Sequence, residues 1–225
     1  MLIDTLLAEN KNFVLIGEAG SGKTETALNL AVAMAKATDR CVHFFDMDQT
    51  KPLFRARESA AELEREGVRF HFQDQYLDAP VVASGVRERL CDPGSVVLLD
   101  IGGGSHGSHM IGQFADLLNR EETKVLYLVN PFRPWSRSRE DIFETVRRVL
   151  GTAGLVKLSL VANPNLGKTT TLADICAGWE KLRALLPERE PEFLCALAEH
   201  AEAAGAACGV PVFPIQLNTL PDWFR

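Results

Sequence analysis

The 225-residue chain has few cysteines, no dense run of basic residues and no long apolar segment. Its five cysteines are too widely spaced for Cys-x2-Cys metal pairs or a dense disulfide framework, so reduced thiols are expected. A net charge of −6 argues against a protein dedicated to binding nucleic acid. No apolar run approaches the roughly 20 residues that span a bilayer, and no signal peptide opens the chain. We therefore expect a cytoplasmic protein without a membrane span.

The composition that remains is that of a globular α/β protein. An apolar share of 46% is enough to build a hydrophobic core. The length suits one domain, which we predict to cover residues 1–225. No repeat, linker or low-complexity stretch interrupts the pattern.

Residues 17–24 form the most informative stretch of the chain. They read Gly-Glu-Ala-Gly-Ser-Gly-Lys-Thr and fit the phosphate-loop pattern Gly-x4-Gly-Lys-Ser/Thr. An apolar run at 13–16 precedes them and a helix-favouring run at 25–36 follows, which is the strand-loop-helix context that the motif requires. In such a loop the backbone amides surround a phosphate chain. Lys23 is expected to reach the β- and γ-phosphates, and the Thr24 hydroxyl to ligate Mg²⁺.

Short apolar strands alternate with helices along the rest of the chain. This alternation predicts a mainly parallel central sheet with helices on both faces, the three-layer α/β/α arrangement of a P-loop NTPase. The run 96–99 is expected to be a central strand, and 210–215 an edge strand because of its prolines. The other predicted strands are 41–45, 68–72, 125–129 and 155–161, and the other predicted helices are 1–11, 53–66, 81–91, 111–119, 138–150, 170–186 and 191–208.

Polar residues stand at the ends of several predicted strands, where ligands bind in such sheets. Asp100 ends the strand 96–99 and is followed by Gly103, an Asp-x-x-Gly pattern in which the acid supports Mg²⁺ through water and the glycine senses the γ-phosphate. Asp46 and Asp48 follow the strand 41–45. We expect Asp46 to support the metal shell and Asp48 to orient the attacking water.

Asn163, at the end of the strand 155–161, is a candidate reader of the base. Its amide can pair with the edge of adenine, although an Asn in this place also suits a plain turn. Guanine-specific relatives of phosphate-loop proteins usually carry Asn-Lys-x-Asp, whereas the residues here are Asn-Pro-Asn-Leu at 163–166. The absence of the acid favours ATP over GTP.

Three further features have weaker signals. Residues 167–169 (Gly-Lys-Thr) imitate the end of a phosphate loop, but the glycine required at 162 is Ala162, so a helix start is predicted instead. His106 and His109 are three positions apart, and this spacing is the sole indication of a metal site there. The segment 133–139 holds Trp135 among arginines and is interpreted as solvated surface, with a partner site as the alternative.

Taken together, these motifs resemble the MinD/ParA-type ATPases of the SIMIBI class of P-loop NTPases. The resemblance covers about residues 11–217. It implies a seven- or eight-stranded sheet, ATP and Mg²⁺ as cofactors, a protein partner and a nucleotide-dependent homodimer. Catalytic roles then fall to Lys23 and Asp48, and metal support to Thr24, Asp46 and Asp100. The nucleotide-binding residues are Gly17, Gly20, Ser21, Gly22, Lys23, Thr24, Glu25, Gly103 and Asn163.

The chain departs from those ATPases at Glu18, where they usually carry a lysine that reaches across the dimer. The paired cysteines of the metal-carrying relatives are also missing, and the end of the chain holds no evident amphipathic targeting helix. Three functions are therefore considered. The first is a switch ATPase whose nucleotide state controls a protein partner. The others are a kinase acting on a small-molecule or polynucleotide hydroxyl, and a nucleotide-binding module without turnover.

Overall fold

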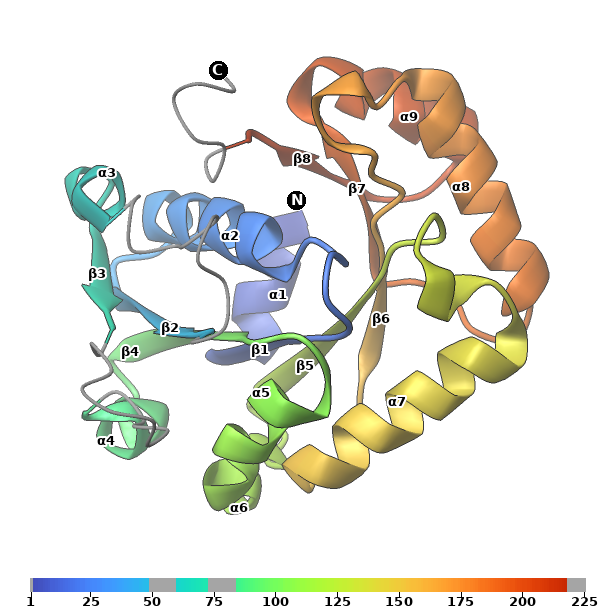
Figure 1. The fold of residues 1–225 in the computed structure, drawn as a ribbon. Helices are drawn as coiled ribbons and strands as arrows, with labels where there is room; N and C mark the ends of the chain where they lie inside the picture. The colour runs from blue at the N-terminus through green and yellow to red at the C-terminus, as the bar shows by residue number, and fades with distance from the viewer. Residues whose placement is uncertain (1, 49–59, 73–83, 218–225) are drawn as a thin grey trace.

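One parallel sheet organises the computed structural model, which describes residues 2–48, 60–72 and 84–217 (Figure 1). Within these residues the strand order is β3-β2-β4-β1-β5-β6-β7-β8, and every neighbouring pair is parallel. The strands are β1 (Asn12–Ile16), β2 (Cys41–Met47), β3 (Val68–His71), β4 (Ser95–Ile101), β5 (Thr123–Val129), β6 (Ser159–Ala162), β7 (Phe193–Leu197) and β8 (Val212–Ile215).

Helices cover both faces of this sheet (Figure 1). The helices α1 (Leu2–Glu9), α2 (Lys23–Ala37) and α3 (Ala60–Arg65) pack on one face. The opposite face carries α4 (Val86–Cys91), α5 (Gly104–Ile111), α6 (Ala115–Leu118), α7 (Arg139–Ala153), α8 (Leu172–Leu185) and α9 (Ala201–Cys208). The predicted three-layer architecture is therefore confirmed.

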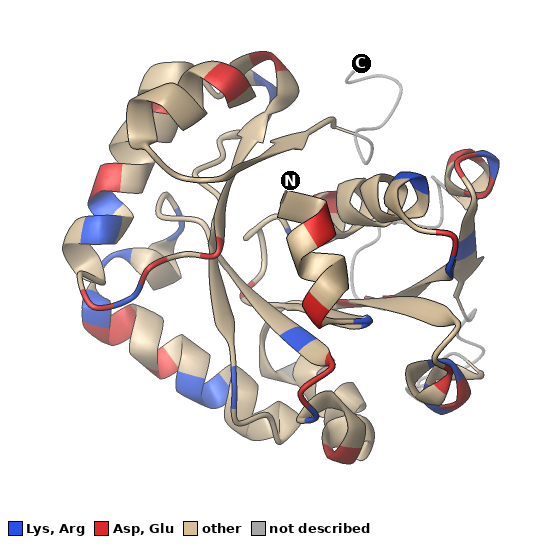
Figure 2. Cartoon of the chain, turned by 180° about the vertical axis from the view of Figure 1, so that it is seen from behind, with Lys and Arg blue, Asp and Glu red and all other residues tan. Residues whose placement is uncertain are grey.

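The two layers of helices enclose two separate hydrophobic cores. Successive residues of β1 enter them in turn: Phe13 and Leu15 face α2, whereas Val14 and Ile16 face the opposite layer. All four side chains are fully buried. A strand that is buried on both faces has a continuous apolar sequence, which is why the run before the phosphate loop contains no polar residue. Figure 2 shows the same division, with most charged residues on the helices and few on the strands.

Several helix boundaries follow from local capping. The helix α7 begins with a capping box in which the Ser138 hydroxyl accepts from the Asp141 amide, and it ends at Gly154 in the left-handed conformation. Thr171 and Asp174 form a second capping box at the start of α8. The helix start predicted at 167–169 is instead a 3-10 turn, Gly167–Thr169, and α8 begins at Leu172.

The largest error of the sequence-based assignment concerns residues 191–208. We predicted one long helix there, but Phe193–Leu197 is the strand β7, paired with β6 and β8, and only Ala201–Cys208 is α-helical. A short, wholly apolar run has no periodicity that separates a buried strand from a buried helix. The alanines that follow it favoured the helix.

Smaller corrections concern three other segments. The helix expected from 111 begins earlier, because Gly104–Ile111 is already α-helical. The strand expected at 155–161 is shorter, covering Ser159–Ala162. Residues 53–59 and 81–83 of two predicted helices lie outside the described residues, as does Gln49. The central position of β4 and the edge position of β8 are confirmed.

Within the described ranges, no helix combines the length and the apolar character that crossing a membrane requires.

Candidate phosphate-binding site

The loop between β1 and α2 has a backbone that glycine alone accommodates well. Gly17, Gly20 and Gly22 have φ angles of 147°, 72° and 93°, and side chains rarely adopt such values. A Cβ on Gly17 would also stand 2.7 Å from the carbonyl oxygen of Leu128. The pattern glycines are thus required by the shape of the loop itself. That shape is the curled backbone expected of a phosphate cradle.

The lysine of the loop is buried within it. Lys23 is 1% exposed, and its Nζ donates to the backbone carbonyl of Glu18 at 2.9 Å. Thr24 and Glu25 are also buried in the first turn of α2. In the described part of the chain the buried Ser21 Oγ has no hydrogen-bond partner. A helix N-terminus with a lysine and a buried hydroxyl beside it fits a phosphate chain.

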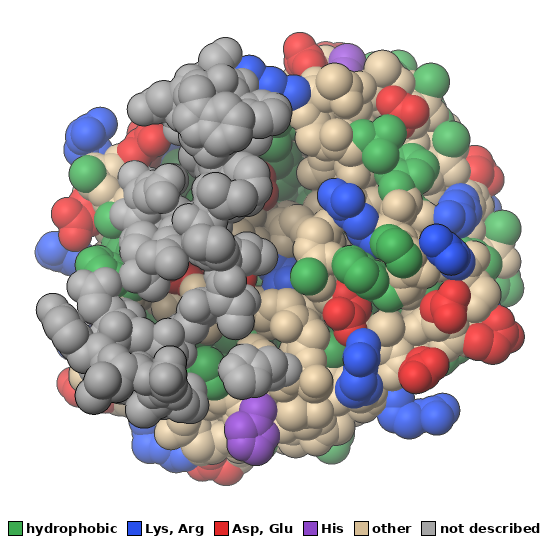
Figure 3. Space-filling model, in the orientation of Figure 1, with side chains coloured by type: hydrophobic (Ala, Val, Ile, Leu, Met, Phe, Trp, Pro, Cys, Tyr) green, Lys and Arg blue, Asp and Glu red, His purple; other side chains and the backbone are tan. Residues whose placement is uncertain are grey.

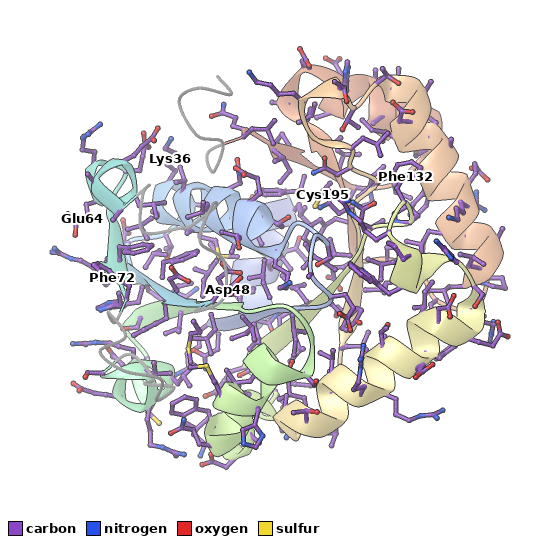
Figure 4. The ribbon with its side chains drawn as sticks, in the orientation of Figure 1. Lys36, Asp48, Glu64, Phe72, Phe132 and Cys195 are labelled. Carbon is purple, nitrogen blue, oxygen red and sulfur yellow. The ribbon has the colours of Figure 1, made fainter. Side chains whose placement is uncertain are left out.

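Three carboxylates lie at the ends of adjacent strands. Asp46 of β2 aligns with Asp100 of β4, and Asp46, Asp48 and Asp100 are at most 7% exposed. The Asp46 Oδ1 accepts from the Asp48 amide at 3.0 Å. The Asp48 Oδ1 lies 3.0 Å from where a Cβ on Gly102 would stand, so this carboxylate packs on the loop after β4. Figure 4 shows Asp48 at the end of β2, close to α2.

The glycine loop after β4 touches the phosphate loop directly. A Cβ on Gly103 would stand 2.8 Å from the Ala19 nitrogen, and the Gly104 amide donates to the Gly17 carbonyl at 3.3 Å. Gly103 therefore lies beside the cradle, where a residue that senses the γ-phosphate was predicted. Gly104, the last glycine of this loop, is the first residue of α5.

Asn163 contacts the phosphate loop through its side-chain amide. Its Nδ2 donates to the Ser21 carbonyl at 2.7 Å, and a Cβ on Gly22 would stand only 2.0 Å from this nitrogen. This contact uses one of the two donors of the side-chain amide, and the reading of adenine by Asn163 stays a prediction. The residue is close to the site, as predicted, but it braces the cradle.

Sequence reasoning missed two arginines that contact the same loop. The Arg133 Nε donates to the Gly20 carbonyl at 3.2 Å, so the segment 133–139 is more than solvated surface. Arg148 of α7 forms an ion pair with the Glu18 carboxylate at 2.5 Å. Neither arginine belongs to a motif, and only the fold brings them to the loop.

Other residues singled out in the sequence lie apart from this arrangement or support it indirectly. His109 is exposed on α5, and the side chain of His106 lies outside the described part of the structure. The Asn130 Nδ2 donates to the Asn165 carbonyl at 2.8 Å, which ties the loops after β5 and β6 together. Among the described residues, no group of three His, Cys, Asp or Glu side chains could hold a metal ion.

Comparison with solved structures identifies the fold. The receptor protein FtsY from Mycoplasma mycoides matches 80% of this chain and 58% of its own, with 14% identity and a TM-score of 0.50. The fold is that of the P-loop NTPases. No family model and no curated protein matches the chain.

Two further structures match with lower scores. The 54 kDa signal recognition particle protein from Aeropyrum pernix K1, in complex with GDP, has 16% identity, 91% coverage of this chain, 40% of its own and a TM-score of 0.39. FlhF complexed with GTP and Mg²⁺ has 17% identity, 77% and 66% coverage and a TM-score of 0.43. The chain thus spans about half the length of the first of these proteins and of FtsY. The finer resemblance to MinD/ParA-type ATPases is not confirmed by these comparisons.

Proposed function

We propose that this protein binds and hydrolyses a Mg²⁺–nucleoside triphosphate and acts as a switch for a protein partner. The observation that carries the proposal is the buried Lys23 inside a glycine cradle at the N-terminus of α2, with carboxylates at the neighbouring strand ends. In that arrangement Lys23 exchanges the Glu18 carbonyl for phosphate oxygens. Thr24 would supply a hydroxyl to Mg²⁺, and Asp46 and Asp100 would support its water shell. The metal would neutralise phosphate charge when bound.

Hydrolysis is assigned to Asp48 as the residue that orients the attacking water. The water oxygen bonds to the γ-phosphorus, the bond to the β-phosphate oxygen breaks, and a nucleoside diphosphate and inorganic phosphate leave. The contact of Asp48 with Gly102 supports a switch, because the diphosphate state would release a loop that α5 continues.

The nucleotide base is the least supported part of the proposal. We keep ATP as the hypothesis because the stretch 163–166 lacks the acid that reads guanine. The role of Asn163 as a reader of adenine stays a prediction, and two of the matched structures are named with GDP or GTP. A competition titration with Mg·ATP and Mg·GTP tests the choice, and a preference for GTP would replace ATP.

The binding claim is tested by Lys23→Ala. Loss of charge-assisted hydrogen bonds to two phosphates should weaken triphosphate binding about 100-fold, measured by calorimetry. Lys36→Ala, at the far end of α2, serves as the control and should bind like the wild type. Unchanged affinity for the triphosphate in Lys23→Ala would contradict the proposal.

The hydrolysis claim is tested by Asp48→Asn. Phosphate release without any acceptor should fall by about 10²–10⁴-fold, the usual contribution of a residue that takes or orients a proton, while affinity changes little. Turnover at the wild-type rate would contradict the role of Asp48. Product formed only when a hydroxyl acceptor is added would favour the kinase, and tight binding without turnover in the wild type would favour the binding module.

A further inference from the structure

The carboxylate of Glu18 places a negative charge beside the phosphate loop. Its backbone carbonyl holds the Lys23 Nζ, so the residue borders the lysine that would bind phosphate. Its side chain is 12% exposed, and its Oε2 lies 3.5 Å from where a Cβ on Gly104 would stand. A carboxylate with so little water around it is weakly screened, and it would repel a polyphosphate.

Arg148 supplies the opposite charge. It projects from α7 and pairs with the Glu18 Oε1, while its own side chain stays 51% exposed. Both charges act on Tyr127, whose hydroxyl donates to the Thr145 Oγ1, one turn earlier on α7, at 3.3 Å. Burial raises the pKa of Tyr127 to about 12, with smaller opposing effects of Glu18 and Arg148. This phenol is therefore neutral, and Arg148 is the cation that faces Glu18.

We propose that Arg148 is a positioning residue of the triphosphate site, which makes the cradle competent for polyphosphate by neutralising Glu18. The inference rests on the proposed function, since it concerns the same ligand. Part of the affinity for the triphosphate then comes from α7, a helix that contains no residue of the phosphate loop. The helix α7 also carries Arg139 and Arg147 beside acidic residues, and Figure 3 shows basic and acidic side chains mixed on this side of the molecule. Only the contact with Glu18 distinguishes Arg148 from these neighbours.

A double-mutant cycle of charge-neutralising substitutions measures this effect by calorimetry with Mg·ATP and Mg·GTP at low salt. Arg148→Gln should weaken binding about tenfold, because it leaves Glu18 unpaired beside the phosphates. Glu18→Gln should bind as well as the wild type or better. The double variant Glu18→Gln/Arg148→Gln should return to within about threefold of the wild type.

The matched control is Arg147→Gln, which removes the same charge from the exposed neighbouring position of α7. It should bind like the wild type, and Arg148→Lys should retain most of the affinity. The loss in Arg148→Gln should also shrink at high salt.

The outcomes separate this inference from the proposed function. A merely structural tie between α7 and the loop predicts that both single variants and the double variant bind weakly, and that result would overturn the inference. Wild-type affinity in Arg148→Gln would overturn it as well. If the wild type binds neither nucleotide, the proposed function fails and the inference fails with it.

Discussion

Two histidines on neighbouring strands form a hydrogen bond far from the phosphate loop. The His43 Nδ1 and the His71 Nε2 are 2.8 Å apart, and the His71 ring stacks on Phe45 at 4.4 Å between centroids. Burial lowers the pKa of His43 to about 4, with help from His71 and Arg89. The pKa of His71 is lowered too, chiefly by burial. The pair is therefore neutral at physiological pH.

This pair should make the stability of the fold depend on pH. The pKa of His43 in the folded state lies below its unfolded value, so the unfolded chain binds the proton more tightly. The stabilisation is complete above about pH 6.5 and is lost as the pH falls towards 4. Its size for His43 is on the order of 2–3 kcal/mol.

The variant His43→Phe tests that prediction, because it keeps a ring in the stack and removes the titrating group. Urea denaturation at pH 7.5 and pH 5 should show a smaller loss of unfolding free energy in the variant than in the wild type. The control is His200→Gln, which replaces a partly exposed histidine beside Glu199. This variant should lose as much unfolding free energy between the two pH values as the wild type. An equal loss in His43→Phe and the wild type would contradict the assignment.

At the scale of elements, the N-terminus of α5 packs directly against the phosphate loop. Gly103 has an ordinary extended backbone, with φ −63° and ψ 143°. Its need for glycine comes from Ala19, whose backbone nitrogen is 2.8 Å and whose Cβ is 3.0 Å from where a Cβ would stand. Because both sides of this contact are main chain, neither can move without shifting a whole loop.

Gly103→Ala should therefore destabilise the protein by about 1–3 kcal/mol, the usual cost of overpacking. The matched control is Gly151→Ala in α7, where an added Cβ meets nothing within 4 Å. That variant should be more stable by about 0.5–1 kcal/mol, since alanine favours a helix interior. Thermal or urea denaturation measures both changes, and a neutral Gly103→Ala would show that the two loops move apart freely.

The same elements show how far the sequence could be interpreted. Local patterns were enough for the phosphate loop, for the alternation of strands and helices and for the capped helix α7. They failed at β7, whose apolar run becomes a strand only through its pairing with β6 and β8. The partners of Asn163, Arg133 and Glu18 could not be predicted either. Each depends on which loops the topology brings together, and no local rule describes that.

At the scale of the whole molecule, the position of β1 decides where the site lies. It has β4 on one side and β5 on the other, so the strand order changes direction at the phosphate loop. Ligands bind at such a point in parallel sheets. Loops after β4, β5 and β6 then reach the cradle through Gly103, Arg133 and Asn163. Asp48, at the end of β2, packs on Gly102 of the loop after β4.

The central place of β1 also affects how the protein is made. Asn12 aligns with Val97 on one side and with Thr123 on the other, so both partners of the strand are synthesised long after it. Pairings so distant in sequence slow folding. A nascent or truncated chain that stops before β5 carries the complete motif of residues 17–24 and still lacks one of the two strands that flank β1. On the ribosome, the cradle remains unfinished beyond Val129, because Asn163, which braces it, is synthesised later still.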